Sequence, residues 1–239
     1  MECKRAKTRR RRRAGKGFMG VDRIPPTRFG QLATIDHVSM RDWMGQGGIE
    51  GACDVLNFYD FYSECKYSCP VHGLDTWESY THLNWIKGRG KIDHIYHDNY
   101  TSLKAAVHQL GAQSERSTPG IHHSNSIIER QNQIILYGTK VILFQAGLPA
   151  CYWTYASPYF CHIENISEDE NGDSAWKKRH GARFKGKTFP FGCGVYYLPT
   201  TTGWGGMNSK AAPNMSYGIF LGYRLAPGGR WNGEYLVAD

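Results

Sequence analysis

The chain has 239 residues, of which 41% are hydrophobic and 21% are charged, as is typical of a globular protein that buries a core. Its net charge of +8 comes from the N-terminus, because residues 1–17 hold nine of the 29 basic residues and one of the 21 acidic residues. No apolar stretch reaches the roughly 18 residues of a membrane span, and no apolar segment follows the charged start. We therefore expect neither a membrane-spanning helix nor a signal peptide.

The N-terminal segment, residues 1–28, is expected to be a disordered basic tail and approach, since so dense a charge cannot bury enough apolar surface to fold. Binding to nucleic-acid phosphates and nuclear import are its two functional interpretations, and a solvated linker is the alternative. The arginines that would contact phosphate are Arg9, Arg10, Arg11, Arg12 and Arg13. The seven cysteines are scattered and odd in number, so we expect reduced thiols in an intracellular protein of the nucleus or cytoplasm.

Five segments of the central region have the composition of β-strands. The first and the fourth each carry a carboxylate, with Asp36 inside the strand and Asp98 at the strand end. The second and third are expected to be joined by a hairpin turn. The predicted strands cover residues 32–38, 52–61, 64–71, 92–98 and 112–116.

Four segments of the same region are predicted to be helical. Asp75 can cap the first of them, and Gly88 ends it. The third is the clearest, because isoleucine and valine recur every seven residues and form a continuous apolar face, which Gly147 and Pro149 terminate. The predicted helices cover residues 76–87, 101–110, 125–146 and 150–163.

The composition changes after residue 163. An acidic turn region and a basic stretch come first, and the remainder is rich in glycine and tyrosine. Strand-like pieces at 193–198, 217–223 and 233–238 predict a small β-barrel-like module at the C-terminal end.

Outside the tail, five basic residues are candidate nucleic-acid contacts. Arg130 and Lys140 lie on the long predicted helix, where a surface ion pair or a solvated helix face is the alternative. Lys177, Lys178 and Arg179 belong to the basic stretch, and their alternative is pairing with the acidic turn just before it.

Three acids, Asp36, Asp98 and Glu129, occur where packing alone would not place them, since each adjoins apolar strand or helix residues. A half-buried carboxylate needs a partner, and a hard divalent cation is a natural one. Two carboxylates on strands and one on a facing helix can hold two Mg²⁺ ions for phosphoryl transfer. From spacing alone, three separate surface residues or helix caps remain the alternative.

Several segments resemble the integrases of Copia-type retrotransposons. The stretch STPG at 117–120, followed by NSIIERQN at 125–132, is similar to the family's TPG…NGVAERxN segment. LFQAGLP at 143–149 and YWTYA at 152–156 resemble the part that comes next. Further similar segments are FGQLATIDH at 29–37, HDN at 97–99, PFGC at 190–193 and GIFLGY at 218–223.

This resemblance implies an α/β fold with an RNase H-like mixed five-stranded sheet flanked by helices, followed by a small SH3-like β-barrel module. The implied divisions are an integrase catalytic core over 29–163, a charged linker over 164–188 and the SH3-like module over 189–239.

The resemblance also implies a catalytic triad of Asp36, Asp98 and Glu129 that binds Mg²⁺ or Mn²⁺. In that family, water first trims the 3′ ends of the element's DNA, and those 3′ hydroxyls then attack target DNA. The implied function is DNA integration, with element ends and target DNA as partners of a homo-multimer.

The chain departs from the family pattern in two respects. The interval between Asp98 and Glu129 is shorter than in the family, and no upstream His-Cys zinc domain or reverse transcriptase region is present. We therefore expect a fragment or decayed copy of a longer polyprotein. A catalytically inactive nucleic-acid-binding relic is the alternative function, and a nuclease that uses only water as nucleophile is a third.

Overall fold

The computed structural model describes residues 25–41, 44–98, 100–116, 126–198 and 214–239. The basic tail, with Arg9 to Arg13, lies outside these residues, so the disorder and phosphate binding expected of it stay predictions. Within the described part of the chain, no helix is both long and apolar enough to cross a membrane.

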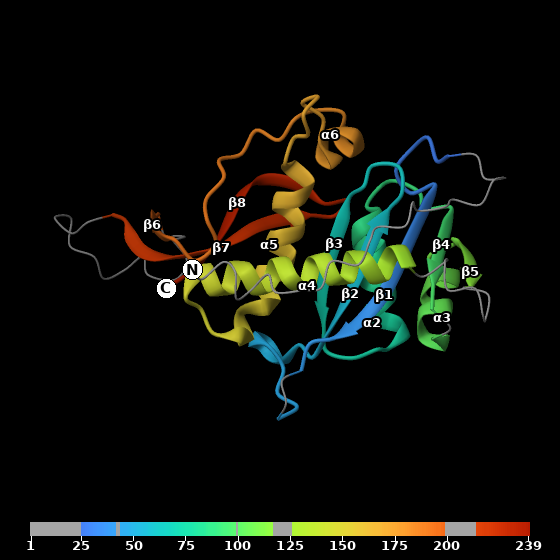
Figure 1. Cartoon of the computed structure of the whole chain (residues 1–239), viewed down its shortest axis with the longest axis horizontal. Helices are drawn as coiled ribbons and strands as arrows, with labels where there is room; N and C mark the ends of the chain where they lie inside the picture. The colour runs from blue at the N-terminus through green and yellow to red at the C-terminus, as the bar shows by residue number, and fades with distance from the viewer. Residues whose placement is uncertain (1–24, 42–43, 99, 117–125, 199–213) are drawn as a thin grey trace, which may run out of the picture.

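A mixed five-stranded sheet lies at the centre of the fold, as predicted. Its strands are β1 (Leu32–Ser39), β2 (Asp54–Asp60), β3 (Lys66–Val71), β4 (His94–His97) and β5 (Gln113–Arg116). They are arranged in the order β3-β2-β1-β4-β5, as Figure 1 shows. Strand β2 is antiparallel to both β1 and β3, whereas β4 runs parallel to β1 and β5 runs parallel to β4. The sheet therefore has the mixed character that the sequence predicts.

Helices pack against this sheet. They are α2 (Thr76–Lys87), α3 (Thr101–Gln109), α4 (Ser126–Ala146) and α5 (Trp153–Ile166), the last preceded by a 3-10 turn, η2 (Ala150–Tyr152). On one face, Leu83 and Ile86 of α2 and Leu103 of α3 join the strand residues Ile35 and Phe58 in a fully buried cluster. Helix α4 runs across β1 and β2, and α5 contacts β3 (Figure 1).

The local signals in the sequence account for the ends of the two best-predicted helices. Helix α2 begins after Asp75, whose Oδ1 accepts a hydrogen bond from the Glu78 backbone N at 2.8 Å. It ends at Gly88, where φ is 58° and a residue without a Cβ is favoured. Helix α4 ends before Gly147, which also has a positive φ of 66°.

A second sheet forms the C-terminal part. Its strands are β6 (Gly194–Tyr197), β7 (Ser216–Ala226) and β8 (Arg230–Ala238), all antiparallel in the order β6-β7-β8. The three strands predicted here are confirmed, but within the described residues they form an open sheet, so closure into a barrel stays a prediction. Tyr159 of α5 packs on this sheet, with its ring centroid 6.0 Å from that of Phe220 and 6.3 Å from that of Tyr223. The second hydrophobic cluster therefore contains residues of both α5 and β7.

The segment 164–188, expected to be a charged linker, contains a short helix, α6 (Ala175–His180). Ser174 caps this helix, because its Oγ accepts a hydrogen bond from the Lys177 backbone N at 3.1 Å. Trp176 is buried and its ring centroid lies 5.6 Å from that of His162 on α5. Six residues are too few to show a helical repeat in the sequence. The charged composition therefore predicted a linker where the structure has a helix that packs on the fold.

Candidate functional site

Asp36 and Asp98 lie next to each other because of the register between two parallel strands. Ile35 on β1 pairs with His97 on β4, so the next position along each strand is an aspartate. Ile35 belongs to the cluster under α2 and α3, so alternation along β1 directs Asp36 to the opposite face, which α4 crosses. The backbone carbonyl of Asp98 is held at 2.8 Å by the Tyr100 N–H, and it also lies 2.6 Å from His97 Nδ1.

An amide relay connects α4 to the two central strands. Asn132 on α4 donates from Nδ2 to Asp36 Oδ2 at 2.8 Å. Its Oδ1 accepts from Asn57 Nδ2 at 2.9 Å, and Asn57 is the register partner of Asp36 on β2. Residues three apart in a helix share a face, so the relay also sets the position of Glu129, one turn before Asn132.

The electrostatics of Asp36 show that Asp98 and Glu129 both act on this carboxyl group. Burial raises the pKa of Asp36 to about 6, and the negative charges of Asp98 and Glu129 push it in the same direction. Hydrogen bonds from Asn132 and from the His37 backbone oppose the shift. Because the pKa is nevertheless raised, desolvation and like-charge repulsion outweigh these hydrogen bonds.

The three acids are neighbours, but they do not form a closed cage. Among the described residues, no group of three His, Cys, Asp or Glu side chains is positioned to hold a metal ion. This finding is compatible with the effect of the two charges on Asp36, because Coulombic influence extends well beyond metal-ligand distances. Glu129 is exposed, whereas Asp36 and Asp98 are half-buried, so the glutamate is the member of the set most open to solvent.

Two of the predicted nucleic-acid contacts lie on the outer face of α4. Arg130 and Lys140 are both exposed, and Gln133 and Tyr137 lie between them at helical spacing. The Lys140 ammonium is 5.8 Å from the centroid of the Tyr137 ring. The outer face of α4 therefore presents basic and aromatic side chains in a line that begins beside Glu129.

The basic stretch is engaged within the fold. Lys177 pairs with Asp173 at 2.5 Å and Arg183 pairs with Glu168 at 3.1 Å, as the alternative of pairing with the acidic turn predicts. Lys178 pairs with Glu64 at 2.8 Å. These ion pairs are partly exposed and contribute little stability. Lys177 and Lys178 can therefore exchange their acidic partners for phosphate.

Arg179 has a different environment from its neighbours. Its guanidinium lies over the Phe29 ring at 3.7 Å and the Tyr67 ring at 4.8 Å. Its Nη2 also donates to the Ile86 carbonyl at 2.5 Å. The Arg179 side chain joins α6 to the central sheet. Its guanidinium contacts groups within the fold rather than facing outward toward a phosphate.

The cysteines in the described residues are all free. Cys65, just before β3, and Cys69, within it, are buried core residues, and burial raises the pKa of Cys65 to about 11. His72 is exposed and lies 3.0 Å from Glu78 Oε1 through its Nδ1. The two thiols therefore belong to the core, and His72 belongs to an ion pair with Glu78.

Sequence reasoning missed Asn57, which proves central to the relay. The signal was present, since Asn57 is a carboxamide between the apolar residues Leu56 and Phe58 at the middle of a strand. In the structure, only 2% of Asn57 is exposed. A buried polar group needs a hydrogen-bond partner, so its position predicts a contact but does not identify the partner residue.

Comparison with known protein families finds no match for this chain, and comparison with curated proteins finds no relative.

Proposed function

We propose that the protein is a metal-dependent polynucleotidyl transferase of the integrase type, with Asp36, Asp98 and Glu129 as its catalytic, metal-binding acids. The observation that carries the proposal is the environment of Asp36. Its pKa is raised to about 6 by burial and by the charges of Asp98 and Glu129. Perturbed acids that gather from separate elements are typical of functional sites.

The arrangement of the strands supports the same proposal. The order β3-β2-β1-β4-β5, with β1 parallel to β4 and antiparallel to β2, is the arrangement expected of an RNase H-like core. The segment that resembles Copia-type integrases begins α4 and carries both Glu129 and Asn132. Fold similarity alone does not specify chemistry, so the proposal depends on the three acids, and the strand order is supporting evidence.

The donor set suits Mg²⁺ or Mn²⁺. Carboxylate oxygens are the hard ligands that these ions prefer, and a nearby cation would favour the charged form of a carboxylate that burial disfavours. Asp36 and Asp98 would supply oxygens from the sheet and Glu129 from α4. When bound, a pair of such ions activates an attacking oxygen and neutralises charge that develops on the phosphoryl group.

The chain's own residues would position the substrate. In the proposed reaction, the oxygen of water or of a DNA 3′ hydroxyl forms a bond to phosphorus as the bond to the leaving oxygen breaks. Asn57 and Asn132 hold Asp36 in place through the amide relay. Arg130 and Lys140 would contact the DNA backbone along the outer face of α4.

The experiment is a DNA cleavage and joining assay with the full chain, a supercoiled plasmid and labelled duplex oligonucleotides. We expect activity with Mg²⁺ or Mn²⁺, no activity with EDTA, and loss of activity in Asp98→Asn. The control is Asp93→Asn, which changes a carboxylate just before β4 that pairs with Lys91 at 3.0 Å, away from the site. Activity that survives Asp98→Asn would remove this aspartate from the mechanism.

A catalytically inactive nucleic-acid-binding protein is the second candidate. The observation in its favour is that no group of three acids in the described residues is already positioned to hold a metal. This alternative predicts DNA binding that weakens with salt, is unchanged in Asp98→Asn, and is mostly lost when residues 1–17 are deleted. The products of the assay separate the third candidate, because a nuclease nicks DNA without joining it.

A further inference from the structure

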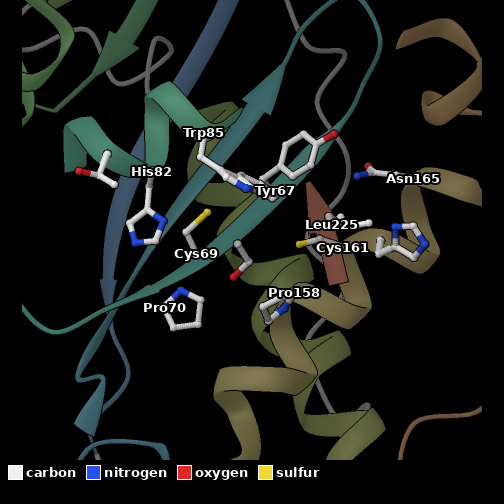
Figure 2. A pocket seen from close by; sticks show the side chains of 12 residues that line it. Tyr67, Cys69, Pro70, His82, Trp85, Pro158, Cys161, Asn165 and Leu225 are labelled. Carbon is white, nitrogen blue, oxygen red and sulfur yellow. The ribbon is translucent and has the colours of Figure 1, made fainter. Parts of the chain in front are cut away.

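A cavity of about 320 Å³ lies away from the acids, at the free edge of the central sheet. Strand β3 forms its floor, and α2 and α5 form its walls. Figure 2 shows Cys69 and Pro70 on β3, His82 and Trp85 on α2, and Cys161 and Asn165 on α5.

The lining is uncharged throughout. None of the twelve described residues around the cavity is an Asp, Glu, Lys or Arg. The two thiols are neutral, since burial raises the pKa of Cys69 to about 12 and also raises that of Cys161. His162 is neutral as well, because burial lowers its pKa to about 4. A charged ligand would lose its hydration here without gaining a counter-ion, so the cavity selects against charge.

Polar groups at the cavity are few and specific. The Asn165 side chain is already satisfied, since its Oδ1 accepts from the Lys66 N–H at 2.9 Å and its Nδ2 donates to the Lys66 carbonyl at 2.8 Å. His162 is 3% exposed, and its Nε2 has no hydrogen-bond partner among the described residues. The rings of Trp176, Phe184 and Tyr223 enclose this imidazole, so the nitrogen is not open to a ligand in the cavity.

The size and the walls favour a planar molecule of two fused rings. An apolar cavity of about 150 Å³ holds one benzene molecule, so about twice that volume suits a bicyclic ring system. Tyr67 and Trp85 present aromatic rings to the space, with their centroids 6.2 Å apart in an edge-on arrangement. Aromatic and sulfur-containing walls interact favourably with another aromatic ring.

The cavity also lies where the two sheets meet. Leu225 of β7 contributes to its lining, and the Gly228 N–H in the β7–β8 turn donates to the Trp85 carbonyl at 2.7 Å. A molecule in this space would therefore contact the central sheet, both flanking helices and the C-terminal sheet together. Sites at the junction of two structural units are common places for ligands.

From these observations we infer that the cavity at the β3 edge binds an uncharged, bicyclic aromatic molecule. The occupied cavity stabilises the packing of the C-terminal sheet on the core. This inference is independent of the chemistry proposed for the acids.

The experiment titrates the full chain with naphthol and, as the matched control ligand, with naphthoate, which has the same rings and a negative charge. Calorimetry should show saturable binding of naphthol at one site and none of naphthoate, and naphthol should raise the Tm with concentration. Cys161→Met and Cys69→Met, which fill the space from α5 and from β3, should each weaken naphthol binding by about tenfold or more. Cys151→Met, at an exposed cysteine outside the cavity, should leave binding unchanged.

A readout on the unaltered chain removes any dependence on how the variants fold. In NMR spectra of the unaltered chain, bound naphthol should show nuclear Overhauser contacts to the ring protons of Tyr67 and Trp85. The inference is overturned if naphthol does not bind, if naphthoate binds equally well, or if these contacts fall on residues outside the cavity.

Discussion

Asp36 lies in an environment that disfavours its own charge. The strand that carries it is buried on one side, and two further acids act on it from β4 and α4. The hydrogen bonds from Asn132 and from the His37 backbone do not offset this combination. Such an arrangement costs the isolated protein stability, which natural sequences retain mainly where a function requires it.

Replacing Asp36 should therefore stabilise the protein without metal. The pKa of Asp36 is raised to about 6, so from about pH 4 to about pH 6 the folded state keeps a proton that the unfolded state has released. The stability of the wild type relative to Asp36→Asn should fall as pH rises through this window and stay constant above it. The expected difference at neutral pH is roughly 1–2 kcal/mol, discounted for partial exposure. Chemical denaturation of both proteins in EDTA across the window measures it, and a difference independent of pH would contradict the assignment.

The hydrogen bond from Asn132 should be visible in the titration of Asp36. This bond favours the carboxylate, so Asn132→Ala should raise the pKa of Asp36 above its wild-type value. Carbon-13 NMR of the side-chain carboxyl group measures the shift directly. Gln133→Ala is the matched control, since this neighbouring carboxamide is exposed on the other side of α4. An unchanged titration in Asn132→Ala would show that the bond does not control the ionisation of Asp36.

At the scale of residues, the order of the acids and the local motif were enough to single out Asp36, Asp98 and Glu129. The strand register that makes Asp36 and Asp98 adjacent was not predictable, because pairing between β1 and β4 depends on contacts between residues 62 positions apart. Asn57 was missed for the same reason, since its partner lies on a helix far along the chain.

Helix α4 approaches α5 closely at a glycine. A Cβ at Gly138 would lie 2.1 Å from the Phe160 ring, a distance that requires the ring or the helix to move. Glycine is otherwise unfavourable inside a helix by roughly 1 kcal/mol relative to alanine. The close packing of the two helices therefore explains a residue that local propensity disfavours.

Gly138→Ala should consequently destabilise the protein, by roughly 1–3 kcal/mol, although the same change stabilises most helices. The matched background is Phe160→Ala, in which the obstructing ring is absent. There, Gly138→Ala should be neutral or stabilising, and denaturation of the four proteins completes a double-mutant cycle. A stabilising effect of Gly138→Ala in the wild type would show that α4 and α5 are farther apart than described.

At the scale of elements, the bounds of a helix or strand were predictable where nearby residues determine them, and were not where distant contacts determine them. Helix α2 was predicted with its bounds because Asp75 caps it and Gly88 ends it, both within the helix's own sequence. Helix α6 was missed because Trp176 packs against α5, which no local signal reveals. Strand β7 extends beyond its predicted bounds because β8 pairs with its whole C-terminal half.

The two sheets are joined at a contact between backbones. Gly88 at the end of α2 faces the β7–β8 turn, where a Cβ on Gly88 would lie 2.6 Å from the Gly228 Cα. The Gly228 N–H then reaches the Trp85 carbonyl at 2.7 Å. This junction was not predictable, because it depends on two glycines whose local roles, a helix end and a turn, give no sign of contact.

Gly88→Ala should be costly for two reasons, its positive φ of 58° and the obstruction of Gly228. Gly111→Ala is the matched control, because Gly111 has a positive φ of 79° and nothing within 4 Å of an added Cβ. Gly88→Ala should lower the free energy of unfolding by roughly 1–2 kcal/mol more than Gly111→Ala. Equal effects in urea denaturation would show that the two sheets do not meet at this point.

The most direct test of the proposed function is the binding of Mn²⁺ to the full chain, followed by electron paramagnetic resonance of the free ion. The wild type should bind Mn²⁺, more tightly as pH rises above about 6, because Asp36 must release its proton. Asp36→Asn, Asp98→Asn and Glu129→Gln should each weaken binding by about tenfold or more, and Asp93→Asn should leave it unchanged. Binding that is absent in the wild type, or equally strong in all five proteins, would contradict a metal site built from these three acids.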